Sequence, residues 1–220
     1  MKQQKVWIVW GLTLLIFAMG YVSVQSQAAS DSKLENTNLN SADSSNNGAI
    51  NPKKKANYTE SVSINGDDVT IIGDSVIVGV EPYLKEMLPK VTVDGKVGRQ
   101  MSQARELIKQ LSIQQKLGDR IIIELGTNGP FSKDQLRSLL KSLDEAKQVL
   151  VVTTRVPKGW QDAVNSNIND VVGDFKNAEV VDWYTASEGK GQYFYKDGVH
   201  LTPDGNRFYA SLLIQALEEK

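Results

Sequence analysis

Residues 69–75 have the sequence Val-Thr-Ile-Ile-Gly-Asp-Ser, a short apolar run that ends in a glycine, an aspartate and a serine. The β-branched residues favour a strand, and a run without polar alternation is typical of a strand buried on both faces. Glycine permits a tight turn directly after such a strand. The segment therefore predicts a strand of a parallel sheet with the hydroxyl of Ser75 at its carboxyl end.

Similar apolar runs follow along the chain, at residues 91–93, 120–125, 148–154 and 179–182. Helical patterns separate them, at residues 80–88, 100–117, 132–146 and 160–175, with a last helix after Thr202. Strands that alternate with helices predict an α/β fold. We expect a three-layer, doubly wound parallel sheet of about five strands, in the flavodoxin-like order 2-1-3-4-5.

Capping residues mark several of these helices. Gly118 is expected to end the helix at 100–117, since glycine is favoured just beyond a helix. Ser132 and Gln135 have the spacing of a capping box. Thr202 followed by Pro203 is typical of a helix start, because proline suits the first helical position.

The predicted topology favours one place for a site. Sheets of this order bind ligands beyond the carboxyl ends of the strands, between the first and third strands. Those two strands end in Gly73-Asp74-Ser75 and in Gly126-Thr127-Asn128. The polar residues and the topology thus indicate the same edge of the sheet.

The residue types at this edge suit nucleophilic catalysis. A serine hydroxyl is a weak nucleophile and needs a base, and His200 is the single histidine of the chain. Asp197 lies three residues earlier, a spacing that lets its carboxylate reach the far ring nitrogen. Ser75, His200 and Asp197 are therefore the predicted catalytic residues, with the carboxylate fixing the tautomer of the ring.

An oxyanion hole is expected beside them. Ser75 and Gly98 offer backbone N–H groups and Asn128 offers a side-chain N–H group. Each of these motifs alone has a structural explanation as a turn or a site of close packing. Their joint placement, at the ends of neighbouring strands and just before the last helix, favours the catalytic interpretation.

Composition excludes other classes of function. The formal net charge of −1 argues against nucleic acid as a partner. The chain has no cysteine and one histidine, which excludes thiolate sites and sites built on several imidazoles. Phosphate-loop, dinucleotide and zinc-protease motifs are missing. We therefore expect neither a metal nor a cofactor.

The N-terminal part is expected to direct export. Lys2 and Lys5 precede an uncharged stretch that is mostly apolar from residue 6 to residue 24. Residues 1–28 are predicted to be either a cleaved signal peptide or a retained membrane anchor. Residues 29–68 have a linker composition, in which the lysine run 53–55 is interpreted as solvated, and residues 69–220 form the folded domain.

The blocks containing Ser75, Gly98, Asn128 and the Asp197–His200 pair resemble those of the SGNH (GDSL) hydrolase superfamily over the whole predicted domain. The similarity is greater to the extracellular domain of OatA-type peptidoglycan O-acetyltransferases. That group shares Val-Gly-Arg-Gln at 97–100, Glu-Leu-Gly-Thr-Asn-Gly at 124–129 and Asp-Gly-Val-His-Leu at 197–201. Trp160 and Asn165 fall where the same group has similar residues.

This resemblance implies acetyl transfer to muramoyl hydroxyls through an acetyl-serine, outside the membrane of a Gram-positive-type bacterium. Gly129 replaces the aspartate of many SGNH hydrolases, which weakens a plain esterase assignment. The transferases usually carry a large membrane domain that supplies acetyl groups. With one apolar segment, this chain needs either a membrane partner as acetyl donor or acetyl esters as substrates.

Alternatives remain open at this stage. An esterase acting on carbohydrate or lipid esters shares the first half-reaction, and a non-catalytic wall-binding module would require a broken triad. The aromatic residues 193–195 are expected to fix a loop on the sheet edge or to line a sugar subsite, with the first preferred.

Overall fold

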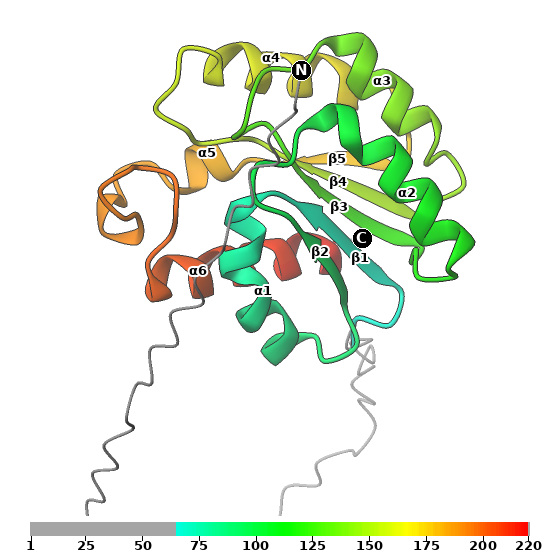
Figure 1. The fold of residues 1–220 in the computed structure, drawn as a ribbon, viewed down its shortest axis with the longest axis horizontal. Helices are drawn as coiled ribbons and strands as arrows, with labels where there is room; N and C mark the ends of the chain where they lie inside the picture. The colour runs from blue at the N-terminus through cyan, green and yellow to red at the C-terminus, as the bar shows by residue number, and fades with distance from the viewer. Residues whose placement is uncertain (1–64, 220) are drawn as a thin grey trace, which may run out of the picture. The chain divides into compact units, whose positions relative to one another are not determined.

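The computed structural model describes residues 65–219, whose centre is one parallel sheet (Figure 1). Its strands are β1 (Val69–Gly73), β2 (Thr92–Gly95), β3 (Arg120–Glu124), β4 (Gln148–Val152) and β5 (Ala178–Val181). Their order is β2-β1-β3-β4-β5 and every pairing is parallel. The predicted fold class and strand order are confirmed.

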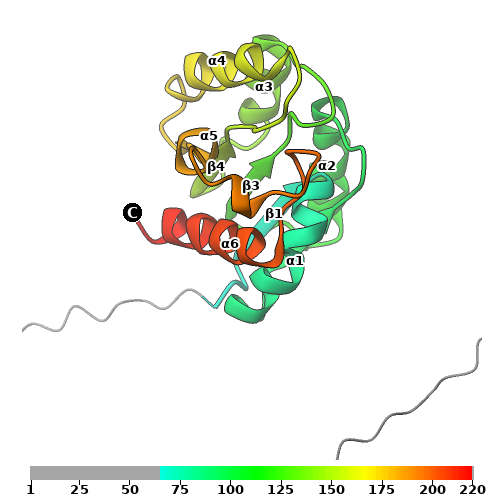
Figure 2. The ribbon, with the colours of Figure 1, turned by 90° about the vertical axis from the view of Figure 1, so that its left-hand side faces the viewer.

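Helices cover both faces of the sheet. They are α1 (Ser75–Met87), α2 (Ala104–Ile113), α3 (Lys133–Lys141), α4 (Gln161–Val172), α5 (Trp183–Ala186) and α6 (Pro203–Glu218), with short 3-10 turns at Met101–Gln103 and Gly191–Tyr193. Helices α1 and α6 lie side by side on one face, whereas α3 and α4 pack together on the other (Figure 2).

The alternation of side chains in the central strands builds two cores. Ile71 and Ile122 face the core under α1 and α6, whereas Ile72 and Ile123 face the core under α2, α3 and α4. All four are buried. Strands covered on both faces need apolar residues at every position, which explains the unbroken apolar runs of the sequence.

Several helix boundaries were predicted well. Ser132 caps α3 through the expected capping box with Gln135, and Thr202 caps α6 ahead of Pro203. Helix α4 lies within the predicted range, but α3 ends at Lys141, before the predicted residue 146. The short helix α5 was not predicted.

Two boundaries differ from the prediction for a physical reason. Helix α1 begins at Ser75, five residues before the expected start, because Asp74 caps it immediately after the strand. Helix α2 ends at Ile113, so Gly118 does not cap it. A Cβ at Gly118 would lie 2.1 Å from the carbonyl oxygen of Asp68, so this glycine is needed for close packing against the start of β1.

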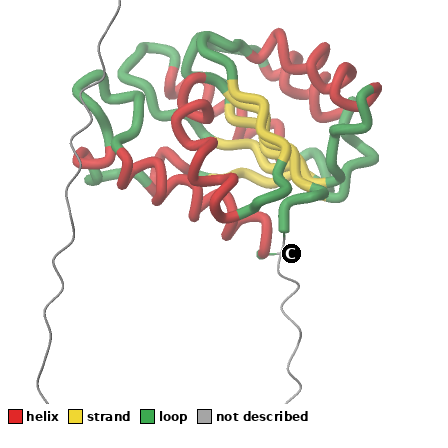
Figure 3. The backbone as a smooth tube through the Cα atoms, turned by 60° about the horizontal axis from the view of Figure 1, so that its bottom comes forward, coloured by secondary structure: helices red, strands yellow, loops and turns green. Residues whose placement is uncertain are grey.

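The strands lie between the two helical layers, and loops gather beyond their ends (Figure 3). The described residues do not include the predicted signal or anchor at 1–28, nor residues 29–64 of the predicted linker. Within residues 65–219, none of the helices has the length and apolar character to cross a membrane.

Candidate active site

A tight turn places Ser75 at the first position of α1. The Asp74 side chain accepts a hydrogen bond from the Val76 N–H group at 3.0 Å and so caps the helix. A Cβ at Gly73 would lie 2.1 Å from a side-chain carbon of Ile77, so only glycine fits between strand and helix. Ser75 is half-buried at the end of the sheet, as its motif predicts.

The single histidine reaches this serine across 125 residues of sequence. His200 Nε2 lies 3.0 Å from Ser75 Oγ, and His200 Nδ1 lies 2.7 Å from Asp197 Oδ2. The hydrogen bond from His200, together with the one from the Val199 N–H group, holds the pKa of the Asp197 carboxyl below its usual value. The carboxylate is therefore the acceptor in a continuous chain from Asp197 through His200 to Ser75.

A hairpin-like turn carries both Asp197 and His200. The Tyr195 N–H group donates to the His200 carbonyl at 2.8 Å, and the Gly198 N–H group donates to the Tyr195 carbonyl at 2.9 Å. Gly198 has a φ of +69°, which favours glycine. Asp197 Oδ1 also accepts from the His200 N–H group at 3.0 Å. These contacts fix the carboxylate and the imidazole relative to one another.

The predicted oxyanion donors come from segments that the fold joins beside Ser75. Asn128 lies in the turn after β3, and its Nδ2 is buried with no hydrogen-bond partner. Burial raises the pKa of Asp74, and the Asn128 amide opposes this rise, so the side chain lies close to the Ser75 turn. A buried amide without a partner is costly, and an incoming oxyanion would satisfy it.

Gly98 lies in the exposed turn after β2, with a φ of +75°. Gln100 connects this turn to the turn after β3, because its side chain donates to the Asn128 carbonyl at 3.1 Å. The turns that carry Gly98 and Asn128 therefore lie together, although no contact of the Gly98 N–H group itself indicates its role.

Sequence analysis missed the organising role of Arg99. Its guanidinium is buried, donates to the Gly73 carbonyl at 2.9 Å and forms an ion pair with Asp94. The Gly73 carbonyl also accepts from the Lys96 N–H group at 3.2 Å. Arg99 thus holds the Gly98 turn against the end of β1. The sequence feature that could have indicated this role is the position of Arg99 directly after Gly98.

A buried carboxyl group lies under the nucleophile and was also missed. Glu124 Oε2 accepts a hydrogen bond from the Asp74 N–H group at 3.2 Å. Burial first, and then the charge of Asp74, raises the pKa of Glu124 well above its usual value. Burial likewise raises the pKa of Asp74. The Tyr209 hydroxyl is buried without a hydrogen-bond partner. Burial first, and then the charges of Glu124 and Asp74, raises the pKa of Tyr209 well above its usual value.

Trp160 and Asn165 position the loop between β4 and α4. The indole Nε1 of Trp160 donates to the Gly126 carbonyl at 3.0 Å. The Asn165 amide pairs with both backbone groups of Thr154, at 2.8 and 3.0 Å. Among the described residues, no group of three or more His, Cys, Asp or Glu could hold a metal ion.

Known proteins resemble about two thirds of the chain. Peptidoglycan O-acetyltransferase OatA of Listeria monocytogenes is 45% identical over 148 residues, which are 67% of this chain and 24% of that protein. O-acetyltransferase OatA of Staphylococcus aureus is 38% identical over 149 residues, again 67% and 24%. The match thus spans about a quarter of the length of these relatives. No family model matches the chain.

Solved structures share the fold. The C-terminal catalytic domain of Streptococcus pneumoniae OatA superposes with a TM-score of 0.63 at 22% identity, covering 70% of this chain and 93% of that one. A lipase/acylhydrolase from Enterococcus faecalis gives 0.58 at 17% identity, with 68% and 95% covered. These likenesses show that the described domain shares the fold of these proteins. Its relatives by sequence include OatA proteins, the group that the motifs of the sequence resemble.

Proposed function

We propose that this protein is a serine acyl-enzyme that transfers acetyl groups to hydroxyls of cell-wall glycan. One observation carries the proposal: Asp197, His200 and Ser75 form a continuous hydrogen-bonded chain at the switch point of the sheet. The sequence similarity to OatA O-acetyltransferases supports acetyl as the transferred group and glycan as the acceptor.

In the first half-reaction, Ser75 Oγ attacks the carbonyl carbon of an acetyl donor while His200 Nε2 takes the hydroxyl proton. The carbonyl oxygen becomes an oxyanion, which the N–H groups of Ser75, Gly98 and Asn128 would stabilise. Each such donor is worth about 3–4 kcal/mol in the transition state. The bond to the leaving oxygen then breaks, and His200 returns the proton to that oxygen.

The second half-reaction reverses these steps with another alcohol. His200 takes the proton of an acceptor hydroxyl as its oxygen attacks the acetyl-serine, and Ser75 leaves with its proton restored. Asp197 stabilises the imidazolium that forms twice in the cycle. Its lowered pKa supports this role, because the carboxylate stays charged at the pH where histidine acts as a base.

The solvent exposure of the His200–Asp197 pair favours the esterase alternative. The side chains of His200 and Asp197 are 49% and 48% exposed, so water has access to the base. Water and a sugar hydroxyl would therefore compete for the same acetyl-serine. A wall-binding module has less support, because the triad geometry is intact.

The donor and the location complete the proposal. A membrane partner protein or a soluble ester is the proposed source of the acetyl group that reaches Ser75. Residues 1–28 would place the domain outside the membrane, as a secreted or a tethered enzyme. Residues 69–220 would form the catalytic domain.

Substitution of Ser75 tests the nucleophile. Ser75→Ala is expected to lower the turnover of a small activated acetyl ester on the order of 10⁴-fold or more, and His200→Ala by a comparable factor, because triad members act as a unit. Intact-protein mass spectrometry of the wild type should show one added acetyl group. Retained turnover in Ser75→Ala, with an unchanged melting temperature, would exclude this nucleophile.

Acceptor profiling separates the transferase from the esterase. The enzyme is supplied with the activated acetyl ester and with chito-oligosaccharide or muropeptide acceptors, and the products are weighed by mass spectrometry. We expect acetylated glycan that forms at the expense of free acetate as the acceptor concentration rises. Free acetate alone, at every acceptor concentration, would reject the transferase in favour of the esterase.

A further inference from the structure

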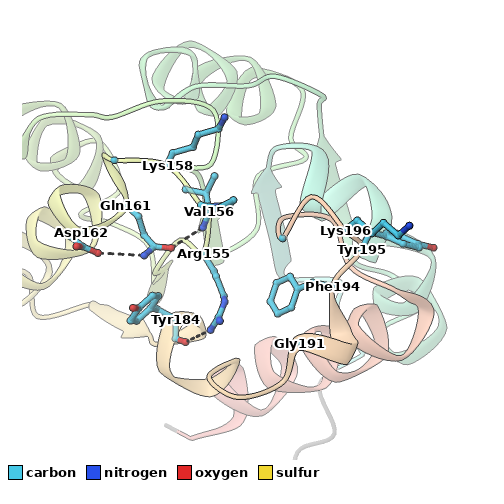
Figure 4. Close-up of a pocket in the computed structure, with 13 residues that line it drawn as sticks. Arg155, Val156, Lys158, Gln161, Asp162, Tyr184, Gly191, Phe194, Tyr195 and Lys196 are labelled. Atoms are coloured by element: carbon cyan, nitrogen blue, oxygen red, sulfur yellow. Dashed lines mark hydrogen bonds between the residues drawn. The ribbon is translucent and has the colours of Figure 1, made fainter.

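A pocket of about 600 Å³ opens beside the turn that carries the triad's base. Its walls are the loop at 155–162, Tyr184 of α5 and the segment 191–198 (Figure 4). Gly198 lines this pocket and also lies between Asp197 and His200 in the sequence. A ligand in the pocket would therefore lie next to the catalytic hairpin.

Arg155 forms the centre of this pocket. Its guanidinium carbon lies 5.8 Å from the ring centroid of Tyr184 and 5.2 Å from that of Phe194, and Figure 4 shows the side chain between the two. Its Nη1 donates to the Ser187 hydroxyl at 3.2 Å and to the Tyr184 carbonyl at 3.4 Å. These contacts fix the orientation of the half-buried guanidinium.

The cations of this pocket form no ion pair within residues 65–219. Lys158 and Lys196 lie at opposite edges of the pocket in Figure 4, and none of the ion pairs of the described residues includes either lysine or Arg155. The one carboxylate of the lining, Asp162, accepts instead from the Gln161 side chain at 3.3 Å. Arg155 is therefore a half-buried cation of the lining that pairs with no carboxylate of the described residues, whereas the two lysines extend outward from the edges of the pocket (Figure 4).

A fixed, half-buried guanidinium without a carboxylate is the arrangement expected of an anion-binding group. Removing such a charge from water is costly unless an anion pairs with it. The planar guanidinium has parallel N–H groups, whose spacing matches the two oxygens of a carboxylate. The aromatic walls of Tyr184 and Phe194 would in addition contact an apolar or sugar portion of the same ligand.

We propose that this pocket binds the carboxylate-bearing peptide attached to the acceptor glycan. The inference rests on the proposed function, which requires a cell-wall acceptor beside His200, and peptide-substituted wall glycans carry free carboxylates. The peptide carboxylate pairs with Arg155, while the sugar hydroxyl lies at the Ser75–His200 pair. The pocket thus selects peptide-substituted sugar units over bare glycan.

Direct binding tests the pocket without turnover. The full chain with Ser75→Ala is titrated with a muramoyl-peptide disaccharide and with the same compound after amidation of its carboxylates. We expect the acidic form to bind about tenfold more tightly, as one charge-assisted hydrogen-bond pair is lost on amidation. Equal dissociation constants for the two forms would overturn the proposal.

Substitutions then locate the interaction. Arg155→Gln in the Ser75→Ala chain should weaken binding of the acidic form about tenfold and remove its advantage over the amidated form. Lys158→Gln combined with Lys196→Gln changes exposed residues only, and it should weaken binding in the same direction. Lys109→Gln on exposed α2 removes the same charge elsewhere and should not alter the dissociation constant.

Other outcomes contradict the proposal separately from the proposed function. One such outcome is that Arg155→Gln lowers the melting temperature while the double substitution of Lys158 and Lys196 leaves the dissociation constant unchanged. Another is that a glycerol phosphate oligomer binds more tightly than the glycopeptide. In either case the pocket does not bind a peptide carboxylate. Failure of the acetyl-serine to form concerns Ser75 alone, because these titrations use chains that lack its hydroxyl.

Discussion

Two carboxyl groups, those of Asp74 and Glu124, lie directly beneath Ser75, and neither faces water. Asp74 caps α1 with one oxygen, while its backbone N–H group donates to Glu124. Burial raises the pKa of both carboxyls, so each keeps its proton to a higher pH in the folded protein than in the unfolded chain. The Ser75 turn thus rests on a layer of buried polar groups.

The burial of Glu124 predicts that this residue lowers the free energy of unfolding by an amount that depends on pH. In the unfolded chain the carboxyl ionises near its usual pKa of 4.5, whereas the folded protein retains the proton to higher pH because of the raised pKa. Stability therefore falls as pH rises above about 4.5 and until the folded pKa is passed. Glu124→Gln removes this dependence while it keeps an acceptor for the Asp74 N–H group.

Urea unfolding of wild type and Glu124→Gln at pH 5 and pH 7 measures the effect. The variant should gain stability relative to the wild type as the pH rises between these values. Glu145→Gln, at an exposed position, controls for the loss of one carboxylate. A difference in unfolding free energy that does not change with pH would contradict a raised pKa for the buried Glu124 carboxyl.

At the scale of elements, α6 holds the catalytic hairpin in place. The Thr202 N–H group donates to the Tyr193 carbonyl at 2.9 Å, and the Tyr193 ring packs 5.0 Å from that of Phe208. Phe194 pairs with Leu201 in a β-bridge and packs against Trp183 at 5.8 Å. Tyr193 and Phe194 therefore pack as anchors of the loop, as predicted, whereas the Tyr195 side chain is exposed. Phe194 and Tyr195 also line the pocket.

Gly205 decides how closely α6 approaches this loop. A Cβ at this buried position would lie 2.2 Å from the Tyr193 carbonyl oxygen, which belongs to the backbone and has little freedom to move. Gly205→Ala is expected to destabilise the fold by about 1–3 kcal/mol. It should also lower ester turnover, because displacement of Tyr193 moves the Asp197–His200 turn away from Ser75.

The matched control is Gly173→Ala at the end of α4. Its φ is −62° and no atom lies within 4 Å of the added Cβ, so we expect a gain of about 0.4–1 kcal/mol. Thermal melting and turnover of an activated ester measure both variants. If Gly205→Ala melts and turns over like the wild type, the tight contact with Tyr193 does not position the hairpin.

At the scale of the whole molecule, the sequence predicted the features that are local. Runs such as 120–125 identify buried strands, and alternation of strands and helices determines the order 2-1-3-4-5 once crossovers are right-handed. The predicted strand order also placed Ser75 and Asn128 at the same edge of the sheet. The fold and the positions of the candidate triad followed from these short patterns.

The remaining features depend on contacts between distant segments. Glycine is required at position 118 because the chain there approaches the backbone of Asp68, and Arg99 acts through the carbonyl of Gly73. Neither contact can be recognised from the residues next to it in the sequence. The pocket around Arg155 needs three separate segments to meet. Such features depend on side-chain packing across the sheet, which residue patterns along the chain do not encode.

The 125-residue separation between Ser75 and His200 has a consequence for biogenesis. During synthesis, a nascent polypeptide presents the alcohol long before the imidazole emerges. The proposed acylation of Ser75 would therefore require an assembled sheet and a docked α6, since only the folded chain brings the base to the hydroxyl. Under the proposed function, turnover would report completed assembly of the domain.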